Sequence, residues 1–179
     1  MSVSEGRIEG RANRPGEPRF AVRKPLRHDV PSWVKLGSLY FITVCCADRT
    51  GQPLLQGSTA AKLTDSARHL HQIGRWYAQL FLVMPDHVHG LVAVPPQTTL
   101  GAQVAAWKGY TRKAHGVRWQ ERFFDHRLRS DEALEEKANY IRLNPVRAGL
   151  VASPQDWPHV FSAADCAGVG SAGTPRPTC

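Results

Sequence analysis

Two histidines separated by one residue, His87 and His89, are the side chains of this sequence best suited to binding a metal ion. They lie in the apolar run between Phe81 and Val92, which is typical of a β-strand. Because side chains at positions i and i+2 of a strand point to the same face, the two imidazoles are expected to stand side by side. Neutral imidazole is a common ligand of divalent metals. The pair therefore predicts a metal site on a rigid strand, although two partly exposed histidines on a sheet would give the same pattern.

A second polar group, far downstream, is predicted to lie on a helix. Tyr140 and Asn144 are four positions apart and share one helical face, beside an apolar stripe of Leu134, Ala138 and Ile141 that would seat the helix on a sheet. An asparagine oxygen at the helix end can complete a two-histidine metal site. The phenol would then be a nucleophile beside a metal that polarises a phosphate. On these residues alone, packing of Tyr140 against the sheet and capping by Asn144 is the favoured interpretation.

Basic and aromatic residues alternate between positions 108 and 129, where seven basic side chains accompany two acidic ones. Basic groups that bind phosphates and aromatic faces that stack bases are what a groove for single-stranded nucleic acid requires. An ordinary charged helix and strand with a buried aromatic edge explains the pattern equally well, and Trp119 fits a core as well as a base-stacking role. The candidate DNA-binding residues are Lys108, Arg112, Lys113, Arg118, Trp119 and Arg122.

Tyr110 is a second candidate nucleophile, because it also lies on a predicted helix among lysine and arginine residues. The position four residues later is Ala114, which cannot bind a metal. Tyr140, with Asn144 at that spacing, is therefore the better candidate.

The length of the chain predicts a single domain, and its charge favours a negatively charged partner. The chain of 179 residues fits one domain, and 23 basic against 15 acidic residues give a net charge of +8, which favours phosphate-rich partners but also suits simple solubility. Four cysteines without a CxxC spacing predict neither a zinc ribbon nor a disulfide framework. With no apolar leader and no run of about 20 apolar residues, the protein is expected to be cytoplasmic, without a membrane partner.

The elements that must position these residues follow from hydrophobic periodicity. Strands are predicted over 38–46, 75–84, 87–94 and 123–129, and helices over 58–74, 99–115 and 131–143. Pro145 disfavours helical geometry at Asn144, so the last helix is expected to end there. The order β-α-β-β-α-β-α predicts an α+β fold of the ferredoxin-like kind, a sandwich with a central antiparallel sheet and helices on one face. Residues 1–31 are expected to be a flexible basic arm and residues 163–179 a disordered tail.

An ordered set of short blocks spans about residues 34–162. They read YFITV at 40–44, VMPDHVH at 83–89, WKGYT at 107–111, RWQERFFDH at 118–126 and NYIRLNPVRAGL at 139–150, followed by Asp156-Trp157-Pro158 and Phe161-Ser162. In this set the chain resembles the HUH (His-hydrophobe-His) tyrosine transposases, specifically the REP-associated branch, which are domesticated relatives of small insertion-sequence transposases. The resemblance implies that residues 32–162 form the catalytic domain.

The resemblance also implies a reaction. The family's His-hydrophobe-His pair and the polar residue four past its tyrosine hold a divalent metal, and the matching positions are His87, His89 and Asn144. The tyrosine, matched by Tyr140, attacks a phosphate of single-stranded DNA at hairpin repeats, so that a covalent 5′-phosphotyrosine forms and a 3′-hydroxyl leaves. No nucleotide cofactor is needed. Mg²⁺ or Mn²⁺ is expected, although imidazole alone would also admit zinc. A monomer or a homodimer is expected.

Three other functions compete with this one. A catalytically silent protein of the same fold that binds DNA hairpins would be expected to have a damaged site, whereas His87, His89, Tyr140 and Asn144 are all present. A metal-dependent hydrolase would need further ligands near the histidine pair, and Gly90-Leu91-Val92-Ala93 supplies none. A ferredoxin-like RNA-binding module predicts exposed aromatic residues on central strands, which the strand histidines fit poorly.

Overall fold

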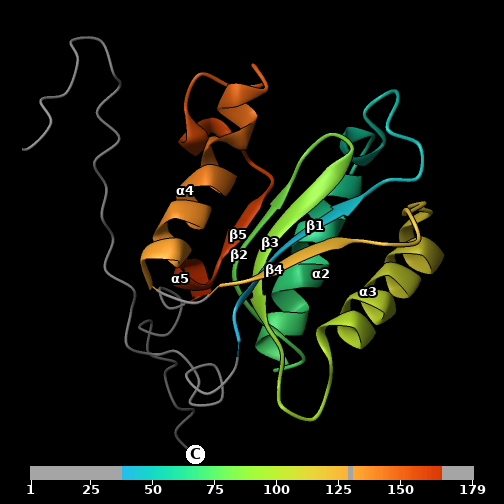
Figure 1. Cartoon of the computed structure of the whole chain (residues 1–179). Coiled ribbons are helices and arrows are strands. Elements are labelled where there is room, and N and C mark those ends of the chain that lie inside the picture. The colour runs from blue at the N-terminus through green and yellow to red at the C-terminus, as the bar shows by residue number, and fades with distance from the viewer. Residues whose placement is uncertain (1–37, 129–130, 167–179) are drawn as a thin grey trace, which may run out of the picture.

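The computed structural model describes residues 38–128 and 131–166, which form an antiparallel sheet with helices on both sides (Figure 1). The sheet has five strands in the order β4-β1-β3-β2-β5. The strands are β1 (Tyr40–Cys45), β2 (Tyr77–Val83), β3 (His87–Ala93), β4 (Phe124–Arg127) and β5 (Val160–Ser162). The helices are α2 (Thr59–Gln72), α3 (Leu100–His115), α4 (Asp131–Arg147) and the short α5 (Ala163–Cys166), with 3-10 turns η1 (Pro53–Leu55) and η2 (Pro154–Asp156). The predicted α+β class with a central antiparallel sheet is confirmed.

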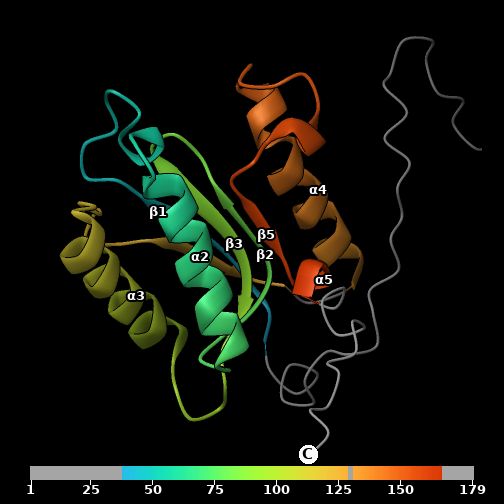
Figure 2. The same cartoon turned by 180° about the vertical axis from the view of Figure 1, so that it is seen from behind.

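Helices cover both faces of the sheet, so the prediction that they share one face is wrong. Helices α2 and α3 lie on one face and α4 on the other, as the opposite views of Figures 1 and 2 show. The apolar core is correspondingly divided into two clusters, one containing Leu63 of α2 and Trp107 of α3, the other containing Ile141 of α4. The physical reason lies in β2 and β3, which are buried at nearly every position and therefore need cover on both sides.

Alternation along β3 assigns its residues to the two faces. Val88 and Val92 belong to the cluster under α2 and α3, whereas Leu91 belongs to the cluster under α4. His87 and His89 have the same parity as Leu91, and so they face α4. The histidine pair is thereby placed on the side of the sheet that carries the helix with Tyr140.

Close packing requires a glycine at position 90, which lies on the same face of β3 as Val88 and Val92. A Cβ atom at this position would lie 3.1 Å from Cγ1 of Ile42 and 3.3 Å from Cγ1 of Val92, and Ile42 is fully buried. We expect Gly90→Val to lower the free energy of unfolding by about 1–3 kcal/mol through overpacking, measured by urea denaturation. The matched control is Gly101→Val, because nothing lies within 4 Å of a Cβ at Gly101. Equal stability of the two variants would contradict this account.

The last long helix continues past the predicted end at Asn144 and includes Pro145. Proline removes one helical hydrogen bond, the one that an amide at position 145 would donate to the carbonyl oxygen of Ile141, and the helix continues past it despite this loss. The helix ends at Arg147. Two residues later Gly149 has a left-handed φ of 68°, and the amide of Leu150 donates to the carbonyl oxygen of Pro145 at 2.9 Å. This is the pattern of a Schellman motif, in which glycine avoids the steric cost of a left-handed residue.

The segment after α4 returns to the sheet as an edge strand that the sequence did not predict. Its three residues pair with β2, with Phe161 opposite Phe81. The indole nitrogen of Trp157 donates to the carbonyl oxygen of Val83 at 2.9 Å, which fixes the segment to the end of β2. Helix α5 (Ala163–Cys166) occupies the first residues of the predicted disordered tail, which is a correction to its start.

The predicted arm at 1–31 and the rest of the tail at 167–179 lie outside the described residues. Among the helices that the structure does describe, none combines the length and apolarity needed to cross a bilayer.

Candidate active site

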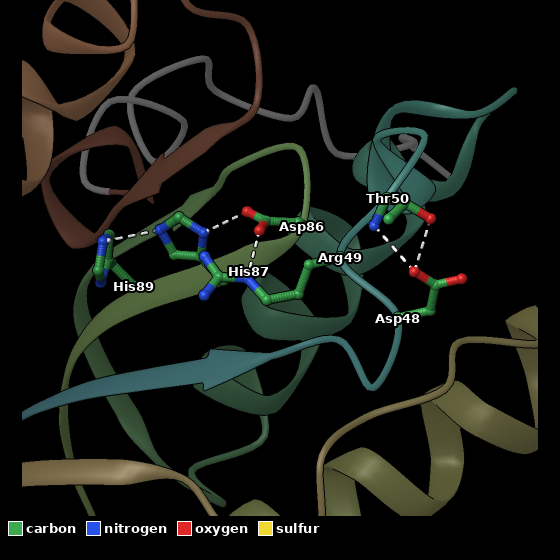
Figure 3. Close-up of polar contacts among 6 residues, drawn as sticks. All are labelled: Asp48, Arg49, Thr50, Asp86, His87 and His89. Carbon is green, nitrogen blue, oxygen red and sulfur yellow. Dashed lines mark hydrogen bonds and ion pairs between the residues drawn. The ribbon is translucent and has the colours of Figure 1, made fainter.

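His87 and His89 stand side by side on β3, in the arrangement that their spacing predicts. Their Nε2 atoms are 3.1 Å apart, and the ring centroids are separated by 4.6 Å with the planes at 80° (Figure 3). His87 is half-buried and His89 is buried. The two atoms that would bind a metal therefore already lie next to each other.

Each ring is held from its other nitrogen. Nδ1 of His87 lies 2.6 Å from Oδ1 of Asp86, and Nε of Arg49 donates to Oδ2 of the same carboxylate at 2.5 Å (Figure 3). Nδ1 of His89 lies 2.9 Å from Oγ1 of Thr43, its cross-strand partner on β1. Because a carboxylate can only accept, Nδ1 of His87 carries the proton. In the neutral ring Nε2 therefore presents its lone pair.

The electrostatics favour ionised Asp86 and neutral His89. Burial alone would raise the pKa of Asp86, but hydrogen bonds from Arg49 and His87 outweigh it and hold that pKa below its usual value. Burial, together with the neighbouring His87, lowers the pKa of His89 to about 3. His89 is therefore uncharged at neutral pH, as a metal ligand must be.

The pair fits a divalent metal ion. The Nε2–Nε2 distance of 3.1 Å is close to the spacing of about 3.0 Å expected for two adjacent octahedral ligands with bonds of about 2.1 Å. Within the described residues no group of three His, Cys, Asp or Glu side chains is arranged to hold a metal. A third protein ligand taken from these residues must therefore be of another type, such as an amide oxygen.

Helix α4 brings Tyr140 against this pair. The Tyr140 ring lies 6.0 Å from the His89 ring and 6.1 Å from the Phe41 ring, edge to face in both cases. Phe41 in turn stacks on His89 at 5.4 Å with an interplanar angle of 24°. Tyr140 keeps 40% of its surface exposed, so its packing against the sheet does not remove it from solvent.

Asn144 follows one turn later on the same helix. Its Nδ2 donates to the carbonyl oxygen of Tyr140 at 3.2 Å, which leaves Oδ1 as the acceptor atom of the amide. The hydrogen bond to its own helix is the contact expected of a capping residue. The Oδ1 atom is of the type that a metal ligand requires.

Two cations beside Tyr140 were not singled out from the sequence. Nζ of Lys137 is 5.8 Å and Cζ of Arg147 is 5.3 Å from the centre of the Tyr140 ring. Positions 137, 140, 144 and 147 have the spacing of one helical face, and that periodicity is the pattern that would have found them. The tyrosine is thereby flanked by positive charge, which suits a phosphate.

Of the six predicted DNA-binding residues, two are engaged in contacts within the protein and four are exposed. Nζ of Lys108 donates to the carbonyl oxygens of Gln120 and Glu121 at 2.7 and 2.8 Å, so this lysine holds the loop before β4. Trp119 packs against Trp107 with a centroid distance of 5.1 Å, as a residue at the border of the core. The remaining four are exposed: Arg112, Lys113, Arg118 and Arg122.

Tyr110 lies far from the histidine pair in the fold. It is 56% exposed on α3, where it lines a groove of about 650 Å³ between α2 and α3 together with Trp107 and His115. Since α3 covers the face of the sheet opposite to α4 (Figure 2), Tyr110 is separated by the sheet from His87 and His89. The structure thus supports the preference for Tyr140.

The carboxylate of Asp86 provides a test of the metal site. We expect Asp86→Ala to weaken Mn²⁺ binding about 10- to 100-fold, because the variant removes the acceptor that fixes the ring and tautomer of His87. Isothermal titration calorimetry measures the effect. The control is Asp48→Ala, since the hydrogen bonds of the Asp48 carboxylate within the described part of the chain are to Thr50, in its own turn (Figure 3). Equal affinities in the two variants would show that Asp86 has no such role.

Comparisons with known proteins find relatives of the chain in both sequence and structure. No family model matches the chain. A REP-associated tyrosine transposase of Escherichia coli strain K12 is 27% identical over 128 residues, covering 68% of this chain and 74% of that protein. A second relative, from Haemophilus influenzae, is named for the same family and is 28% identical over 151 residues, covering 69% of this chain and 78% of its own. The solved structure of a REP-associated tyrosine transposase bound to a REP hairpin superposes with a TM-score of 0.62 at 26% identity, covering 73% of this chain and 80% of the other.

The structure combines an antiparallel sheet, a His-hydrophobe-His pair on its central strand β3 and a tyrosine-bearing helix whose ring contacts that pair, the arrangement expected of an HUH protein. The relatives found by sequence and the solved structure that superposes are all named as REP-associated tyrosine transposases. The chain is a homologue of the REP-associated tyrosine transposases.

Proposed function

We propose that this protein is a metal-dependent transposase or nickase that cleaves and rejoins single-stranded DNA at hairpin repeats through Tyr140. The observation that carries the proposal is the placement of an exposed tyrosine in ring contact with the buried member of a preoriented histidine pair. The homology supports the same class of activity, since the relatives are named as transposases.

In the proposed reaction, the phenol oxygen of Tyr140 attacks the scissile phosphorus and loses its proton. The bond from phosphorus to the 3′-oxygen breaks, that oxygen takes up a proton, and a 5′-phosphotyrosine remains. The reverse attack by a 3′-hydroxyl rejoins the strand. The number of phosphoester bonds is unchanged in each direction, so the reaction needs no nucleotide cofactor.

The chain's own residues orient and stabilise this exchange. Lys137 and Arg147 both lie close to the tyrosine ring, where they can bind the phosphate oxygens on which negative charge develops. His87, His89 and the Asn144 oxygen would hold Mg²⁺ or Mn²⁺, which would supply a Lewis acid for the phosphate and the leaving oxygen. Asp86 and Thr43 hold the two rings through their Nδ1 atoms, which leaves both Nε2 atoms for the metal.

The proposed substrate is a DNA hairpin with a single-stranded extension. A net charge of +8 favours a polyanion, and a structural relative was solved with a REP hairpin bound. The alternative is a silent hairpin-binding protein of the same fold, which would use the same charge and surface without cleavage.

The test uses the full chain and labelled hairpins from repeats that flank its gene. We expect a covalent protein–DNA band on a denaturing gel with Mg²⁺ or Mn²⁺ and none with EDTA. Mass spectrometry of the adduct should place the nucleotide on the peptide containing Tyr140. Hairpins that bind tightly but never yield an adduct with either metal would favour the silent protein instead.

A further inference from the structure

Edge strand β4 (Phe124–Arg127) places an aromatic side chain on the face of the sheet that carries the candidate active site. Phe124 is paired with Thr43 of β1, and Thr43 is paired with His89 of β3. Residues directly opposite one another in an antiparallel sheet point to the same face. Phe124, Thr43 and His89 therefore form one row across the sheet, on the face that α4 covers.

Phe124 is joined to the candidate nucleophile through one ring. Its ring meets the Phe41 ring edge to face at 6.1 Å, and Phe41 contacts both His89 and Tyr140. Phe41 itself is buried, with 8% of its surface exposed, and it lies in contact with both exposed aromatic residues, Phe124 and Tyr140.

The exposure of Phe124 is not explained by the fold. It keeps 58% of its surface open, the largest exposed fraction among the large hydrophobic residues in the described part of the chain that remain exposed. An uncovered phenylalanine on an edge strand is normally avoided, because such a strand invites non-native pairing. The location, one ring away from an exposed tyrosine with Lys137 and Arg147 beside it, combines a flat apolar face with charges that bind phosphate.

We propose that Phe124 is a stacking platform for a nucleobase of single-stranded DNA next to the scissile phosphate. This inference rests on the proposed function and deepens it, by naming the side chain that positions the substrate. Aromatic faces beside basic groups are the recurrent means of holding single strands, and stacking tolerates any base because each has a π-face. Phe124 thus takes the base-stacking role that was one of the two considered for Trp119, whose ring packs against Trp107.

The experiment uses hairpin DNA with a single-stranded extension in which 2-aminopurine replaces one base at a time. The full chain carries Tyr140→Phe, so that the DNA is bound but not cleaved. We expect fluorescence quenching at one position, lost in Phe124→Ala and retained in Phe124→Trp. We also expect Phe124→Ala to raise the Kd about fivefold or more, and removal of the quenched base to have no further effect in that variant.

Tyr110→Ala is the matched control, because Tyr110 is a comparably exposed aromatic residue (56%) on the opposite face of the sheet. The inference is overturned if Phe124→Ala and Tyr110→Ala bind and quench alike while the unmodified chain still forms the covalent adduct. Absence of both hairpin binding and adduct in the unmodified chain would overturn the proposed function and this inference together. Circular dichroism confirms that each variant is folded.

Discussion

Replacing Tyr140 by phenylalanine is expected to abolish the covalent protein–DNA adduct while leaving hairpin binding intact. The substitution removes only the phenol oxygen, and the ring contacts with His89 and Phe41 are kept. Because no other group would form the phosphotyrosine, we expect the rate of adduct formation to fall by roughly a thousandfold or more. A denaturing gel measures the adduct, and fluorescence anisotropy of the labelled hairpin measures the binding.

The informative control for that variant is Tyr110→Phe. It removes the same oxygen from the rival tyrosine on α3, and we expect its adduct yield to equal that of the unmodified chain. An adduct that persists in Tyr140→Phe and disappears in Tyr110→Phe would reverse the assignment. It would also require the DNA to reach the groove between α2 and α3, on the face opposite to the histidine pair.

Replacing His89 by alanine is expected to weaken metal binding by roughly a hundredfold or more, because it removes a ligand rather than a residue that orients one. His87→Ala is expected to have an effect of the same size. In both variants the remaining Nε2 has lost the partner that now lies 3.1 Å away. Mn²⁺ titration by calorimetry measures the loss, and the adduct assay should show a parallel loss of activity.

His69→Ala is the control for these two variants. His69 is exposed on α2, on the far side of the sheet, and its loss should leave Mn²⁺ affinity unchanged. Since His89 is buried, a thermal unfolding curve is needed to show that His89→Ala is still folded under the assay conditions. A folded His89→Ala variant with unchanged Mn²⁺ affinity would exclude the metal site on β3.

Local patterns predicted the parts of the site that depend on one element. The i, i+2 spacing on a strand placed His87 and His89 on one face, and the i, i+4 spacing on a helix placed Tyr140 beside Asn144. Lys137 and Arg147 share the same helical periodicity. Their role beside the tyrosine could be inferred only from the structure, which shows that Tyr140 is exposed and that both cations lie near its ring. The positions of most strands and helices followed from hydrophobic periodicity for the same reason.

Other features depend on contacts between distant segments, and here local patterns failed. The end of α4 was misplaced because Pro145 dominated the prediction, whereas the helix ends at Arg147, two residues before the left-handed Gly149. The sequence left Trp119 open between the core and a base-stacking role, because an aromatic residue among basic ones looks the same whether its ring faces solvent or Trp107.

By itself, the sequence of this protein determined its fold class, its family resemblance and the identity of the candidate metal-binding and nucleophilic residues, since these depend on residue type and on spacing within single elements. Only the tertiary structure decided which face of the sheet α4 covers. It thereby decided that Tyr140 meets His89, that Tyr110 does not, and that Phe124 lies exposed beside them. The physical reason is that β2 and β3 are apolar on both faces, so either face accepts a helix. The choice is made by the packing of the whole chain.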